Sequence, residues 1–187
     1  MPFISYDPTA METKSERNAS TATVRSRPAF AVEPGPGQES VWDYPRPPAI
    51  RRDGRLVEVR DGNAVVATSK GAYKVMETAS PPTFYIPAAD IDFDLLVSVS
   101  DTTYCEWKGT ATYWALARDP AQPVGWCYER PRPRFDIIKG YFAFYPGRVD
   151  CCLGGEPVTT QAGRFYGGWI TSEVVGPFKG EPGTGHW

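Results

Sequence analysis

Proline and glycine recur along the whole chain and restrict it to short secondary-structure elements. The 187 residues include 19 prolines and 18 glycines. Proline lacks an amide hydrogen and glycine loses much backbone entropy on folding, so both interrupt helices. Hydrophobic residues make up 41% of the chain and aromatic residues 13%, which is enough to build a core. We therefore predict a mostly β fold, either a barrel or packed sheets, with at most one or two short helices.

Short runs of β-forming residues separated by turn residues mark the expected strands. Asp61-Gly62-Asn63 is a typical hairpin turn, so the runs 56–60 and 64–68 on either side should pair. Further strands are expected at residues 72–77, 84–86, 90–96, 102–105, 110–116, 126–128, 141–145 and 149–153. The run 149–153 should pair back across the turn at Pro146-Gly147, and residues 135–139 form the predicted short helix.

The sequence divides into an extension and one domain. We expect residues 1–37 to form a flexible N-terminal extension, because residues 11–27 are polar without periodicity and EPGPG at 33–37 is a hinge. Residues 38–187 should form a single β-rich domain. Its C-terminal tail, 163–187, should pack on the domain, because a disordered tail would not usually carry Phe165, Tyr166 and Trp169.

Composition narrows the classes of partner. The net charge of −2 argues against a nucleic-acid-binding protein. No apolar run reaches about 18 residues, so we expect no membrane-spanning helix. The first 17 residues lack a basic region followed by an apolar one, and we therefore predict a cytoplasmic protein. The oligomeric state is left open.

The cysteines and the histidine argue against a metal or cofactor site. Cys105, Cys127, Cys151 and Cys152 form no CxxC pair, and neighbouring residues on a strand point to opposite faces. His186 is the only histidine, so mechanisms that hold an imidazole beside a nucleophile are excluded from the core of the chain. Any catalysis would depend on Glu, Asp, Lys, Cys or Tyr.

Several sequence blocks together resemble one family. They are SVWDYPRPP (40–48), METASPPTFYIPAADI (76–91), TTYCEWKGTATYW (102–114), GWCYERP (125–131) and GYFAFYPGRVD (140–150). They are similar to domain-of-unknown-function family 427, and the tail resembles that of a longer subgroup. The resemblance implies a small β-rich fold similar to that of methionine sulfoxide reductase B. The paired CxxC zinc ligands found in many proteins of that fold are missing here.

Three residues in these blocks are candidate catalytic groups. Lys108 could act as a base or Schiff-base amine, or its stem could simply cover aromatic surface. Cys105, three residues earlier, could be a reactive thiolate or an inert core residue. Glu77 could be a general acid, or it could pair with Lys108 or an arginine to stabilise the structure.

Aromatic residues and an arginine are the candidate substrate-binding groups, namely Tyr85, Trp107, Tyr113, Tyr128 and Arg130. The first functional hypothesis is a domain that binds a small molecule, and as an enzyme would also transform it, in an aromatic pocket around Glu77, Cys105 and Lys108. The alternative is a non-catalytic protein-interaction module that uses the Pro/Arg loops and the aromatic tail. The two differ in whether those three side chains meet in one cavity.

Overall fold

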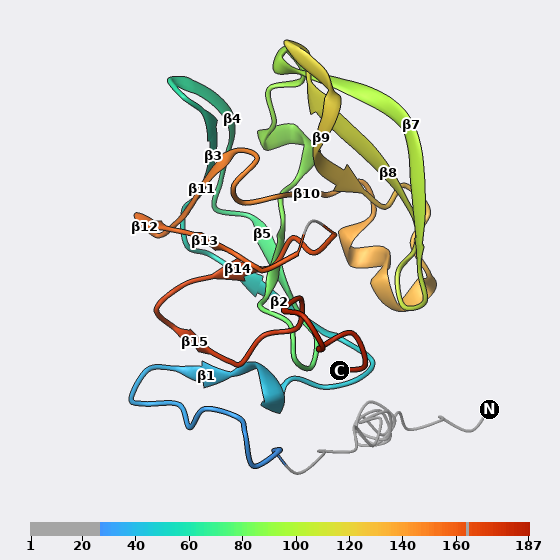
Figure 1. Cartoon of the computed structure of the whole chain (residues 1–187). Coiled ribbons are helices and arrows are strands. Elements are labelled where there is room, and N and C mark those ends of the chain that lie inside the picture. The colour runs from blue at the N-terminus through green and yellow to red at the C-terminus, as the bar shows by residue number, and fades with distance from the viewer. Residues whose placement is uncertain (1–26, 164) are drawn as a thin grey trace, which may run out of the picture.

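Short strands dominate the computed structural model, which describes residues 27–163 and 165–187 (Figure 1). The strands are β1 (Glu39–Ser40), β2 (Ala49–Asp53), β3 (Val57–Asp61), β4 (Ala64–Ser69), β5 (Ala72–Met76), β6 (Thr83–Tyr85), β7 (Leu96–Cys105), β8 (Gly109–Leu116), β9 (Asp119–Cys127), β10 (Phe142–Phe144), β11 (Asp150–Leu153), β12 (Glu156–Pro157), β13 (Thr159–Thr160), β14 (Trp169–Ile170) and β15 (Val174–Val175). The only helices in the described part are short 3-10 helices: η2 (Val41–Asp43), η3 (Ala88–Asp90), η4 (Phe93–Leu95) and η5 (Pro133–Ile138). The predicted mostly β class is confirmed, in the form of packed sheets rather than a closed barrel.

Two four-stranded sheets carry most of the fold. One has the order β10-β9-β8-β7 and the other the order β12-β11-β3-β4. The hairpin predicted around Asp61-Gly62-Asn63 is confirmed, because β3 pairs with β4 across this turn. Gly62 has φ of +58°, a left-handed conformation that glycine adopts without steric cost. The strands predicted at 102–105 and 110–116 are present as β7 and β8, which pair across the intervening turn and are both longer than expected.

A three-stranded sheet, β2-β5-β6, lies between the larger sheets and connects them. Directly after β6, the backbone groups of Ile86 and Phe142 exchange two hydrogen bonds of 2.7 and 2.8 Å. This junction places the end of β6 beside β10 of the first sheet (Figure 1). Side chains from both sheets therefore meet over one core.

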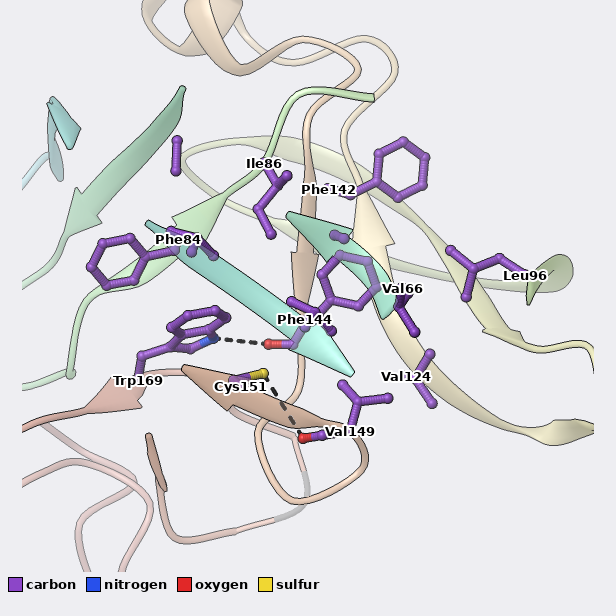
Figure 2. Close-up of a cluster of buried hydrophobic side chains, with 14 of the residues drawn as sticks. Val66, Phe84, Ile86, Leu96, Val124, Phe142, Phe144, Val149, Cys151 and Trp169 are labelled. Atoms are coloured by element: carbon purple, nitrogen blue, oxygen red, sulfur yellow. Dashed lines mark hydrogen bonds between the residues drawn. The ribbon is translucent and has the colours of Figure 1, made fainter. Parts of the chain in front are cut away.

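Trp169 fills the centre of that core. Its side chain is fully buried and packs against Phe84, with the ring centroids 5.2 Å apart (Figure 2). Its indole Nε1 donates a 3.1 Å hydrogen bond to the carbonyl oxygen of Phe144. A residue from the C-terminal tail thus belongs to the same buried cluster as Val66 and Cys151.

Two details of the predicted strands are wrong. Residues 90–96 alternate acidic and apolar side chains, which predicted a half-buried strand, yet Asp90 ends η3, residues 93–95 form η4, and only Leu96 belongs to a strand, as the first residue of β7. Asp92 accepts a hydrogen bond from the amide of Asp94, and this local cap stabilises a turn in place of a strand. The run at 150–153 pairs with β3 and β12 rather than with β10.

Charged residues join the segments on either side of the central strands. Lys74 on β5 is buried and forms an ion pair with Glu39 on β1. Arg55 binds both Asp53, at 2.5 Å, and Glu173 of the tail, at 2.7 Å. β1 and β15 are paired in parallel close to this cluster. These contacts fix the tail to strands from the first half of the chain.

Part of the segment expected to be flexible also makes contacts. The amide of Val32 donates to the carbonyl oxygen of Gly176, and the ring of Phe30 stacks on Trp187 with centroids 5.2 Å apart. Residues 1–26 of that segment lie outside the described residues.

Candidate functional site

A cavity of about 300 Å³ lies where β5, β6 and the sheet of β7, β8 and β9 meet the C-terminal tail. Aromatic side chains are one large group in its lining, and charged, polar and small residues make up most of the rest. The lining residues are Val75, Glu77, Ser80, Pro81, Thr83, Tyr85, Thr103, Cys105, Lys108, Tyr113, Trp126, Tyr128, Tyr145, Gln161, Phe165, Tyr166, Gly167, Gly168 and Lys179. This volume is at the lower end of the range of small-molecule sites, roughly 300–1,000 Å³.

Lys108 is held in the tight turn between β7 and β8. The following residue, Gly109, has φ of +100°, which a residue with a side chain would rarely adopt. The carbonyl oxygen of Lys108 accepts a 3.0 Å hydrogen bond from the amide of Arg132, so the backbone of the turn is tied to the loop after β9. The side chain is only 11% exposed, and its Nζ lies 5.8 Å from the centre of the Phe135 ring. The ammonium is thus directed to the cavity by a constrained backbone.

Glu77 faces Lys108 from the end of β5. The distance between Glu77 Oε2 and Lys108 Nζ is 3.9 Å, beyond hydrogen-bonding range. Within the described residues neither charged group makes a side-chain hydrogen bond. At this separation two unit charges attract by about 4 kcal/mol in a medium of intermediate polarity, before the cost of removing both from water is counted. The two charged groups therefore attract each other without forming a direct hydrogen bond.

Burial keeps three of the tyrosine hydroxyls around the cavity neutral. Burial raises the pKa of Tyr85, Tyr128 and Tyr145 above the usual value for tyrosine. Tyr85 also accepts a 3.3 Å hydrogen bond from Trp126 Nε1. These phenols therefore stay protonated and can both donate and accept hydrogen bonds at neutral pH.

Cys105 reaches the same cavity from the end of β7, and its thiol is half-buried. The remaining cysteines have other positions. Cys127 and Cys151 are buried in the core, and burial raises the pKa of the Cys127 thiol to about 12. In the described part of the chain no three His, Cys, Asp or Glu side chains lie close enough together to hold a metal ion.

Gln161 and several residues of the tail supply another part of the lining. Gln161 is 2% exposed, accepts a 2.9 Å hydrogen bond from the amide of Gly168 and donates a 2.6 Å bond to the carbonyl oxygen of Lys179. Gly167 lies so close to the Trp126 ring that a Cβ atom would overlap it. The side-chain amide and the missing Cβ together allow the tail to lie flat against the cavity.

Six of the eight residues predicted as site residues line this cavity, namely Glu77, Cys105, Lys108, Tyr85, Tyr113 and Tyr128. Two do not. Arg130 is exposed just beyond β9, and Trp107 is partly buried, with an indole N–H that has no hydrogen-bond partner among the described residues. Five further lining residues were not predicted as site residues, namely Trp126, Tyr145, Gln161, Tyr166 and Lys179. For Tyr166, the aromatic composition of the tail was the available sequence signal.

These features define a class of protein: a small β-rich domain with a tyrosine-lined cavity that contains one lysine–glutamate pair. The chain belongs to the family described as NTP_transf_9, domain of unknown function (DUF427), whose sequence model matches residues 49–155. No curated protein matches the chain. Within the described residues, no helix is both long and apolar enough to cross a membrane.

Proposed function

We propose that this chain binds a small molecule in the cavity around Glu77, Cys105 and Lys108. One observation carries the proposal: these three side chains come from the residue after β5, from the end of β7 and from the turn that follows β7, and they line one cavity together with several aromatic rings. Sites of this kind bury most of a ligand against apolar walls and orient it with a few polar groups. Lys108 would hold an anionic or carbonyl group of the ligand.

The same groups provide a route to catalysis. Glu77 could give or take a proton from a ligand that is bound to Lys108, because the two side chains are 3.9 Å apart. Cys105 would act as a neighbouring group or as a nucleophile. The proposal thus includes transformation of the bound molecule by these side chains. The location we propose is the cytoplasm, as predicted from the sequence.

The tail supports this proposal over a protein-interaction module. Trp169 is fully buried, and Gln161, Gly167 and Gly168 form one wall of the cavity. Aromatic groups used inside the molecule are not free to bind a partner. Phe165, at 63% exposed, is the tail aromatic that a partner could contact.

A fragment screen tests the proposal. We would record saturation-transfer NMR spectra of the full chain with a set of small aromatic acids, amines, alcohols and aldehydes. The compounds that bind the wild-type chain should bind a Lys108→Met variant more weakly. Their binding should be unchanged in Lys70→Met, which replaces an exposed lysine. Circular dichroism would establish that both variants are folded. The proposal fails if no compound binds, or if all compounds bind both variants alike.

A further inference from the structure

The charged pair in the cavity differs from the other ion pairs of the described residues. Arg27, Arg55, Lys74 and Arg118 each donate at least one hydrogen bond directly to a carboxylate partner. Lys108 and Glu77 remain 3.9 Å apart, and neither side chain hydrogen-bonds to another described residue. A structural pair gains most from a short contact. The cavity therefore presents one positive and one negative group whose hydrogen-bonding capacity is unused.

We propose that the ligand is a zwitterion that carries an ammonium and a carboxylate group close together, as an α-amino acid does, attached to an apolar side chain. This inference rests on the proposed function, because it names the ligand class of that cavity. The ligand carboxylate would pair with Lys108 and the ligand ammonium with Glu77.

The spacing suits this arrangement. Charge-assisted hydrogen bonds have lengths of about 2.7–2.9 Å. When the ligand carboxylate lies beside Lys108 and the ligand ammonium beside Glu77, the four charges alternate in sign around a ring. The 3.9 Å separation between Nζ and Oε2 is one side of that ring. Each charge then has two neighbours of opposite sign.

Ligands with one charge would satisfy only half of the pair. An anion without an ammonium would bring its negative charge close to Glu77, and a cation without a carboxylate would lie close to Lys108. The other lysine of the lining, Lys179, is already used: its Nζ donates a 2.7 Å hydrogen bond to the carbonyl oxygen of Trp187 and lies 5.8 Å from the Tyr166 ring centre.

The walls account for the remaining parts of such a ligand. The ring faces of Tyr85, Tyr113 and Tyr128 carry partial negative charge that favours a cation, and their edges and carbon atoms form an apolar surface. The neutral phenol hydroxyls can accept from an ammonium or donate to a carboxylate. An aromatic or aliphatic amino-acid side chain would occupy the space toward the tail.

Four probes of similar shape separate the charge requirements. They are L-phenylalanine, 3-phenylpropanoate, 2-phenylethylamine and 3-phenylpropan-1-ol, measured by isothermal titration calorimetry on the full chain. We expect phenylalanine to bind at least about tenfold more tightly than each of the others, because every charged hydrogen bond lost costs roughly one tenfold step or more. Lys108→Met should reduce the advantage over phenylethylamine, and Glu77→Gln the advantage over phenylpropanoate. Lys70→Met is the control that should retain the wild-type order.

The possible failures are distinguishable. If phenylpropanoate or phenylethylamine binds as tightly as phenylalanine, and the binding depends on Lys108, the zwitterion inference is wrong and the small-molecule site stands. If Glu77→Gln leaves the order of the four probes unchanged in a folded protein, the inference is also wrong. If none of the four binds and the fragment screen finds no ligand, both proposals are overturned.

Discussion

Replacing Trp169 with alanine tests whether the C-terminal tail is part of the fold. The side chain is fully buried, packs on Phe84 at 5.2 Å between ring centroids, and donates to the carbonyl oxygen of Phe144 at 3.1 Å. Truncating a buried tryptophan to alanine costs about 3–5 kcal/mol. The unpaired carbonyl adds about 1 kcal/mol. We therefore expect Trp169→Ala to lower the free energy of unfolding by about 5 kcal/mol.

Urea unfolding followed by far-UV circular dichroism measures this change without depending on tryptophan fluorescence. In thermal unfolding the same loss corresponds to a decrease in Tm of about 10–20 °C. Trp169→Phe keeps most of the packing and removes the hydrogen bond, so it should cost about 1–2 kcal/mol. Phe165→Ala in the same tail is the control, because that ring is 63% exposed and should contribute less than about 0.5 kcal/mol.

A loss below about 1 kcal/mol for Trp169→Ala would refute the reasoning. It would mean that the tail does not contribute to the core in solution, and the wall of the cavity formed by Gly167 and Gly168 would then lose its support. In that case the aromatic tail would be better interpreted as a partner-binding segment.

Four further predictions follow from local features. Gly167→Ala should lower the free energy of unfolding by about 1–3 kcal/mol, because the new methyl group would overlap the Trp126 ring, and thermal unfolding would detect this. Burial alone would raise the pKa of Asp53, but hydrogen bonds from Arg55 outweigh it and lower the pKa, so this residue stabilises the fold at neutral pH. That contribution should be lost as the pH falls below about 4, and Asp53→Asn should flatten the acid limb of a stability–pH profile. The Cys127 thiol, with a pKa of about 12, should react with Ellman's reagent only after unfolding in urea. Elemental analysis of the purified protein should find no stoichiometric zinc, because the sequence has no CxxC pair and one histidine.

Local signals in the sequence were sufficient for the hairpins. Asp61-Gly62-Asn63 specifies the turn between β3 and β4 by its own backbone preferences, and the 106–109 turn does the same for β7 and β8. The alternation of acidic and apolar residues at 90–96 was misleading. This pattern is compatible with a strand, but the hydrogen bond from the amide of Asp94 to the side chain of Asp92 favours a turn. The partner of β11 could not be deduced, since strand pairing is decided by contacts that are distant in the sequence.

The candidate site was predictable only where local sequence signals mark its residues. Glu77, Cys105 and Lys108 stood out as the reactive side chains beside aromatic strands, and they line one cavity. Arg130 carried a suitable charge, but two residues beyond Tyr128 the chain has left β9 and the side chain is exposed. Gln161 gave no sequence signal at all, because its role is to bind backbone groups of Gly168 and Lys179 that only the folded tail brings near.

The division of the cavity between two stretches of chain has a consequence for synthesis and for divergence. Residues 49–155, which match the family model, include the charged pair and four of the five lining tyrosines, whereas another part of the lining comes from residues 161–179. During synthesis these later residues are added after the charged pair, so the cavity is complete only once they have been made. Substitutions in residues 161–179 would reshape that part of the lining without changing Glu77 or Lys108. Under the proposed function, such substitutions would alter which ligand is selected while the residues proposed to hold its charged groups stay the same.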